Sequence, residues 1–172
     1  MVPTSPSIIV SDTSVLVNFL RIDRMDLIAD HSHNFIVTDH VVAEITDHYP
    51  DQQSRFAQAQ AAGILQQVSI TDPAELALFA GLTASGRLGT GECSAIAFAS
   101  HQGHILAIDD RRASNHARRV SRNLQILTTQ DLIVSMIHES LLDVAQADAI
   151  KDEWANHHRF RIAVQSFADL IP

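Results

Sequence analysis

Short apolar runs that do not alternate with polar residues constrain the fold of this chain more than any other feature. A strand with one face in water alternates apolar and polar residues, whereas a strand buried on both faces is apolar throughout. Runs of the second kind occur at residues 7–10 (SIIV), 35–38 (FIVT), 105–108 (ILAI) and, less purely, 64–70 and 124–127. They predict the buried strands of a parallel sheet.

Segments with helical character separate these runs. Apolar spacing, capping residues and Gly or Pro stops predict helices over residues 14–20, 51–62, 74–83 and 92–101, a helix after the second strand that Asp39 could cap, one through the arginines after residue 110, and one capped near residues 128–131. Strands alternating with helices are typical of a sheet covered on both faces. We therefore predict an α/β fold, a three-layer α/β/α domain with a central, mostly parallel sheet.

Composition agrees with one globular domain. The 172 residues are 46% hydrophobic and 19% charged, and we find no repeat or linker. Cys93 is the only cysteine, and no apolar run approaches the roughly 20 residues of a membrane span, so we expect a cytoplasmic protein without disulfides that does not enter a membrane. We expect Cys93 to be a small core residue.

Charge is unevenly distributed along the chain. A net charge of −8 argues against general binding of nucleic acids or acidic membranes. Yet five of the 12 basic residues lie within 12 positions, at Arg111, Arg112, Arg118, Arg119 and Arg122. This patch is either a binding surface for phosphates or only a solvated helix face, and the sequence favours neither.

Acidic residues follow the predicted strands or begin the helices after them. Asp12 follows the first strand, Asp109 and Asp110 follow the run at residues 105–108, and Glu92 begins a helix. Glu44 lies in the helix after the second strand, among apolar neighbours. Ligands of open parallel sheets bind at the carboxyl ends of the strands, where these acids would converge. Taken singly, Asp12, Asp110 and Glu92 could be ordinary helix caps; together they suggest a site for a hard cation such as Mg²⁺ or Mn²⁺.

Other chemistries fit less well. The turn at residues 85–92 (SGRLGTGE) lacks the Lys-Ser/Thr of a phosphate-binding loop. The histidine pairs His31–His33, His101–His104 and His157–His158 have no matching partners for zinc, so we expect them at the surface or at helix ends.

Four stretches, IIVSDTSVLVNFL, VTDHVVAEI, LGTGECSAIAFA and ILAIDDRRAS, resemble in their order and spacing the PIN domain, a metal-dependent nuclease fold of many prokaryotic toxins and RNA-processing enzymes. The resemblance covers residues 7–137, and the remainder resembles the helical tail of one PIN subgroup. We therefore expect residues 1–172 to form a single PIN-like domain with a core over about 7–137 and a tail over about 138–172.

The resemblance implies metal-ligating and catalytic roles for specific residues. Its first three acids correspond to Asp12, Glu44 and Glu92, and its fourth to Asp109 or Asp110; we favour Asp110 as the catalytic ligand with Asp109 in support. Thr13 and Ser14 would orient the first acid or a bound water, or serve only as a cap. Arg111, Arg112, Arg118 and Arg119 would hold the nucleic acid.

The implied function is a Mg²⁺- or Mn²⁺-dependent nuclease that acts on RNA rather than DNA, as the toxin of a toxin–antitoxin pair. A small antitoxin and a second copy of the chain are then the expected partners. The alternative is a catalytically silent PIN-like module that binds nucleic acid or protein. We expect Trp154, Phe160 and Phe167 to pack the last helices onto the body or onto a partner subunit.

Overall fold

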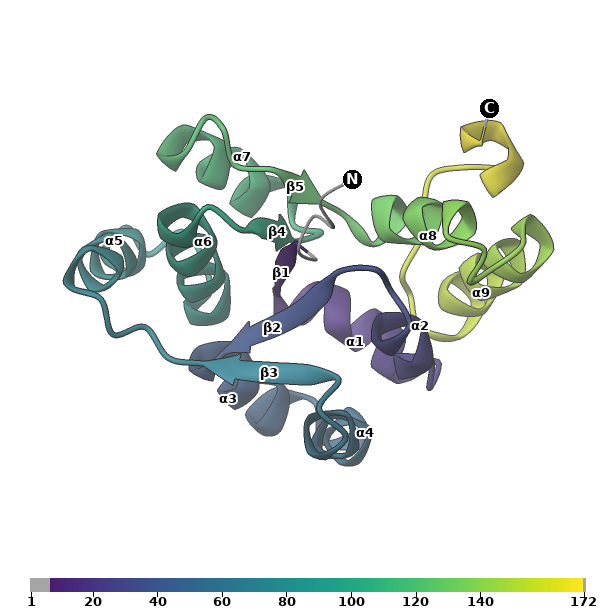
Figure 1. Cartoon of the computed structure of the whole chain (residues 1–172), viewed down its shortest axis with the longest axis horizontal. Coiled ribbons are helices and arrows are strands. Elements are labelled where there is room, and N and C mark those ends of the chain that lie inside the picture. Colours follow the sequence, from purple (N-terminus) through teal and green to yellow (C-terminus); the bar gives the residue numbers. More distant parts are fainter. Residues whose placement is uncertain (1–6, 172) are drawn as a thin grey trace, which may run out of the picture.

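A five-stranded parallel sheet forms the centre of the computed structural model, which describes residues 7–171 (Figure 1). Its strand order is β3-β2-β1-β4-β5. The strands are β1 (Ile8–Ser11), β2 (Asn34–Thr38), β3 (Leu65–Val68), β4 (Ile105–Ala107) and β5 (Ile126–Leu127). Every pairing is parallel, as the unalternating apolar runs predicted.

Helices cover both faces of this sheet. They are α1 (Thr13–Arg21), α2 (Met25–Ala29), α3 (Asp39–His48), α4 (Pro50–Ala61), α5 (Pro73–Ala84), α6 (Thr90–Gln102), α7 (Arg111–Val120), α8 (Thr129–His138), α9 (Val144–His157) and the 3₁₀ turn η1 (Phe167–Leu170). In Figure 1, α5, α6 and α7 lie on one side of the sheet, and α1, α2, α8 and α9 on the other. The predicted three-layer α/β/α fold is confirmed.

Successive strand residues point to opposite faces, so each strand contributes to two hydrophobic cores. Ile9 and Phe35 join a first core with α1, α2, α4, α8 and α9. Val10 and Ile36 join a second core with α5, α6 and α7. Burial on both faces is the physical reason why these strands carry no polar alternation.

The carboxyl ends of β1 and β4 form the point where the strand order reverses. From β1 the chain moves to β2 and β3 on one side, and then returns to β4 on the other side of β1. The amide of Asp12 donates to the carbonyl of Ala107 over 2.9 Å, which joins the two strand ends. Such a switch point is where open α/β sheets bind their ligands.

Several predicted boundaries differ from the structure. The capping residue of α3 is Thr38, whose Oγ1 accepts from the amide of Val41, and Asp39 is the first helical residue, so the predicted cap was wrong. The short helix α2 was not predicted. β5 is shorter than the run at residues 124–127, because Leu124 lies in a turn closed by its bond to the carbonyl of Ser121.

The tail packs onto the first core rather than extending away from it. Trp154 of α9 is 0% exposed, meets Phe19 edge to face, and donates from Nε1 to the carbonyl of Asn18 over 2.8 Å. Phe160 packs against Trp154, and Phe167 is fully buried. The prediction that these aromatics pack the last helices onto the body is confirmed.

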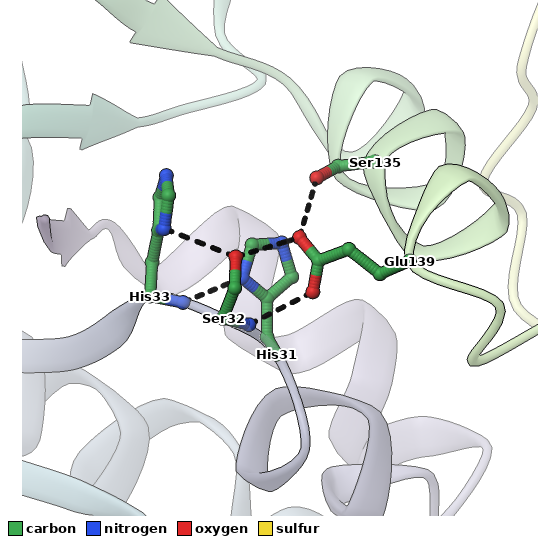
Figure 2. Close-up of polar contacts among 5 residues, drawn as sticks. All are labelled: His31, Ser32, His33, Ser135 and Glu139. Carbon is green, nitrogen blue, oxygen red and sulfur yellow. Dashed lines mark hydrogen bonds and ion pairs between the residues drawn. The ribbon is translucent and has the colours of Figure 1, made fainter. Parts of the chain in front are cut away.

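A polar contact ties the segment before β2 to the end of α8 (Figure 2). Glu139 accepts from the amide and the hydroxyl of Ser32, each over 2.8 Å, and lies 3.6 Å from Nε2 of His31. The His31 side chain is only 1% exposed, so of the two predicted positions it takes the helix end, directly after α2, and not the surface. Burial lowers the pKa of His31, although the charge of Glu139 opposes this.

None of the helices within residues 7–171 is long and apolar enough to cross a membrane.

Candidate active site

Asp12 lies at the centre of the candidate site, directly after β1. It caps α1: its Oδ2 accepts from the amide of Ser14 over 3.1 Å and from the Ser14 hydroxyl over 2.7 Å. The residue is only 2% exposed, and its other oxygen, Oδ1, is buried without a hydrogen-bond partner among the described residues. Burial raises the pKa of Asp12 to about 7, against the hydrogen bonds from Ser14 and with smaller contributions from the charges of Glu92 and Glu44.

Glu44 reaches the site from the middle of α3. Its Oε2 accepts from the hydroxyl of Thr13 over 2.6 Å, and its Oε1 accepts from the amide of Gly91 over 2.9 Å. Gly91 belongs to the first turn of α6, where backbone amides have no partner within the helix. A Cβ at Gly91 would lie 2.5 Å from Oε2 of Glu44, so only glycine permits this approach.

Glu92 and Asp110 begin two helices of the second core. Oε2 of Glu92 accepts from the amide of Gly89 over 2.9 Å at the start of α6, and Oδ1 of Asp110 caps α7 by accepting from the amide of Ala113 over 2.8 Å. Burial raises the pKa of Glu92, and the charges of Asp110 and Glu44 add to the effect, while Arg112 opposes it. The two acids are therefore close enough to repel each other.

Asp109 points in another direction from Asp110. Its oxygens accept from the amide and hydroxyl of Thr129, over 2.8 and 2.6 Å, and from Nδ2 of Asn18 over 3.1 Å. Burial raises its pKa against these bonds. The amide of Asp109 donates to Oγ of Ser14 over 3.3 Å, which in turn donates to Asp12. Ser14 thus links Asp109 to Asp12.

The fold brings together the acids expected from the sequence. Asp12, Glu44, Glu92 and Asp110, which we call the acidic cluster, come from four separate segments. The charges of Glu92 and Glu44 act on Asp12, and those of Asp110 and Glu44 act on Glu92. Three of them lie at the N-termini of α1, α6 and α7, where the helix dipole favours a negative charge. Within residues 7–171, no three His, Cys, Asp or Glu side chains are gathered into a group that could hold a metal ion as they stand.

A basic groove borders the acidic cluster on the side of the second core. It has a volume of about 480 Å³ and is lined by Arg87, Arg112 and Arg119 together with His116. We call it the α7 groove. The predicted residues Arg112 and Arg119 line it, whereas Arg111 and Arg118 do not, because helical spacing places them on another face of α7.

Sequence reasoning missed three residues of this region. Arg87 lies in the turn before α6. The sequence argued against a phosphate-binding loop in this turn, and no binding role was predicted for its arginine. Asn18 is buried and donates to both Asp109 and Thr129. Its position four residues after Ser14 in an otherwise apolar helix was a usable signal. Thr129 gave no such signal, because its contact with Asp109 spans 20 residues.

Comparisons with known proteins agree with this architecture. A family model described as a PIN domain matches residues 8–171. The chain belongs to the PIN domain family. A comparison with curated protein sequences finds no match. PIN domains are generally nucleases and typically use divalent metals.

Two solved structures share the fold of this PIN domain at low sequence identity. A PilT N-terminus domain protein from Sulfolobus solfataricus is 15% identical, with a TM-score of 0.50, over 74% of this chain and 92% of the other. VapBC2 from Rickettsia felis, bound to a DNA fragment from its promoter, is 14% identical, with a TM-score of 0.50, over 70% of this chain and 98% of the other.

The acidic cluster of this PIN domain fits a divalent cation in its chemistry. All of its donors are carboxylate oxygens, the ligands that Mg²⁺ and Mn²⁺ prefer. A buried carboxylate oxygen without a partner, as in Asp12, is costly unless a positive charge meets it. A bound cation would also offset the burial that raises the pKa values of Asp12 and Glu92, together with the smaller repulsion from neighbouring carboxylates.

Proposed function

We propose that this PIN domain is a Mg²⁺- or Mn²⁺-dependent nuclease that hydrolyses phosphodiester bonds, preferably in RNA. One observation carries the proposal: at the switch point of the sheet, Oδ1 of Asp12 is buried without a partner among the described residues, and the charges of Glu92 and Glu44 act on the same carboxyl group. A protein gains no stability from such an arrangement by itself, because each carboxylate raises the cost of ionising the others.

The residues proposed to hold the metal are Asp12, Glu44, Glu92 and Asp110, with Asp109 in support. When bound, the ion supplies an activated water and neutralises the charge that develops on the phosphate. Ser14 holds Asp12 in place through two hydrogen bonds, and Thr13 does the same for Glu44 through one. Asn18 and Thr129 hold Asp109, whose amide fixes Ser14.

The arginines of the α7 groove provide the complementary charge. Guanidinium groups pair with phosphate oxygens in a planar, two-pronged geometry. We assign contacts with the nucleic-acid backbone to Arg112, Arg119 and Arg87 in the groove, and weaker contacts to Arg111 and Arg118 beside it. They offset the repulsion between the phosphates and the acidic cluster.

The PIN family and the shared fold with VapBC2 support a further part of the proposal, that the chain is the toxin of a toxin–antitoxin pair. A small antitoxin would then cover the acidic cluster, and a basic side chain is the natural group to enter it. A homodimer and a cytoplasmic location stay predictions.

The test compares purified wild-type protein with Asp12→Asn on single-stranded RNA and on DNA of the same sequence, with Mg²⁺ or Mn²⁺. We expect cleavage to fall by more than about 100-fold, because the variant removes a direct metal ligand. Asp72→Asn is the matched control, since Asp72 caps α5 in the same way, far from the acidic cluster along the chain. Equal cleavage by Asp12→Asn and wild type would contradict the proposal.

Metal binding itself distinguishes the nuclease from a silent module. Mg²⁺ or Mn²⁺ should raise the melting temperature of the wild type, and Glu92→Gln should abolish most of this gain. A silent module that no longer binds metal would show no metal-dependent stabilisation in either protein.

A further inference from the structure

A second hollow, lined by two arginines, borders the acidic cluster on the side of the first core. Two cavities of about 200 and 440 Å³ share the lining residues Arg21, Tyr49 and Arg159, and so form one continuous depression. We call it the tail groove. Its inner part is also lined by Ser14, Asp109 and Phe160, and its outer part by His48, His157 and His158.

The tail groove begins at the acidic cluster. Ser14, in its wall, donates to Asp12 over 2.7 Å, and Asp109 lies beside Ser14. The α7 groove borders the cluster from the other layer, through Arg112, whose charge acts on Glu92. Because α1 and α9 pack on one face of the sheet and α7 on the other, the two grooves flank the cluster.

Two arginines, Arg21 and Arg159, supply the positive charge of the tail groove. Among residues 7–171, neither Arg21 nor Arg159 forms an ion pair with a carboxylate. Among the same residues, the Arg21 side chain donates to the carbonyl of His158 alone, over 3.4 Å. Burial lowers the pKa of His158, and the charges of Arg21, His157 and Arg55 lower it further, against that of Glu153. Asp51 is the one acid of the outer wall, and Asp109 that of the inner wall.

The backbone at Arg159 adds a separate argument. Its φ is 54°, in the left-handed region, directly after α9. Glycine is the common residue at this position after a helix, and another residue costs about 1–2 kcal/mol there. The chain keeps an arginine where glycine would be more stable, and this arginine lines the groove.

We propose that the tail groove binds the phosphate backbone of the same single-stranded nucleic acid, which runs from the α7 groove across the acidic cluster to Arg21 and Arg159. Tyr49 and Phe160 in its walls provide aromatic rings on which unpaired bases stack. This inference rests on the proposed function for its ligand, and it assigns the C-terminal tail a part in binding substrate.

The test measures binding of a fluorescent single-stranded RNA of 12 nucleotides, with a chelator present so that no metal-dependent cleavage occurs. Each phosphate contact contributes about 0.7 to the slope of log K against log salt, or about fivefold in affinity at 0.1 M salt. Arg21→Ala/Arg159→Ala should therefore weaken binding by about 25-fold and reduce the slope by about 1.4.

Two control variants separate this effect from net charge and from folding. Arg24→Ala/Arg161→Ala removes two positive charges outside both grooves and should change binding by less than about threefold. Arg21→Lys/Arg159→Lys keeps the charges and should restore most of the affinity and the salt slope. A thermal melt of each variant shows whether the tail stays packed after Arg21 loses its bond to His158.

Unchanged affinity and slope in the alanine variant would overturn the inference, as would a wild type that does not bind the RNA. If the alanine variant lost binding to poly-glutamate while its RNA binding stayed unchanged, the result would overturn the inference in favour of an acidic protein partner. Failure of the proposed function looks different: RNA binding would depend on Arg21 and Arg159 as expected, while wild type and Asp12→Asn would both fail to cleave.

Discussion

Replacing Asp12 by Asn should stabilise the metal-free protein at high pH while removing its cleavage activity. The carboxyl of Asp12 has a pKa of about 7 in the folded chain against 3.8 for an ordinary aspartate. The folded state therefore binds a proton that the unfolded state releases between these two pH values. Stability present at low pH is lost as the pH rises through this window.

The magnitude follows from the two pKa values. Relative to low pH, the raised pKa of Asp12 lowers the stability of the folded protein by about 4 kcal/mol at pH 8, where the group is mostly ionised, and by about 2 kcal/mol at pH 5.5, where it stays protonated. Asn keeps the cap of α1, since it accepts as Asp does, but its Nδ2 replaces an oxygen that has no partner, which costs about 1–3 kcal/mol. We expect Asp12→Asn to be more stable than wild type by about 1–3 kcal/mol at pH 8, and this difference in stability should be smaller by about 2 kcal/mol at pH 5.5.

The assay is urea unfolding of wild type and Asp12→Asn in chelator at several pH values between 5.5 and 8. Lowered pKa values of His31, His104 and His158 change stability with pH in both proteins, so only the difference between the two reports on Asp12. In thermal melts, the expected change in this difference is about 4–8 °C. A difference that stays constant with pH would refute the assignment of a buried, costly charge to Asp12.

Three further predictions concern residues around the site. Gly91→Ala should push Glu44 away from α6, lower the stability by about 1–3 kcal/mol in urea unfolding, and reduce RNA cleavage. Gly81→Ala is the control: its Cβ would lie in open space, so it should lower neither stability nor cleavage. Thr129→Val removes the hydroxyl that donates to Asp109 and should lower the stability of the protein by about 1–3 kcal/mol. The loss should be greater at pH 8 than at pH 5, because the lost hydrogen bond favours the charged form of Asp109. An equal loss of stability at both pH values would contradict this. Trp154→Phe keeps an aromatic ring beside Phe19 but leaves the carbonyl of Asn18 without the indole donor. We therefore expect a loss of stability of about 1–3 kcal/mol in urea unfolding, without loss of metal binding. A loss of metal binding would show that α9 positions the site.

Much of the fold was predictable because its signals are local. Glycine after a helix predicted the end of α6 at Gly103, whose φ is 69°. Thr128 caps α8 as expected. The helix α2 escaped because its five residues are too short to show a period. Asp39 was mistaken for a cap because Thr38 was assigned wholly to the preceding strand.

The sequence by itself determined the parallel three-layer fold and a set of acids at the strand ends, because apolar periodicity and the order of strands and helices are properties of neighbouring residues. Only the tertiary structure decided how the acids differ. Asp109 and Asp110 are adjacent in the chain, yet one bonds to Thr129 and Asn18 while the other caps α7 and acts on Glu92. The unpartnered oxygen of Asp12 and the approach of Arg159 to the site likewise depend on contacts across more than 80 residues. Burial and electrostatic repulsion arise from packing, and no local pattern encodes them.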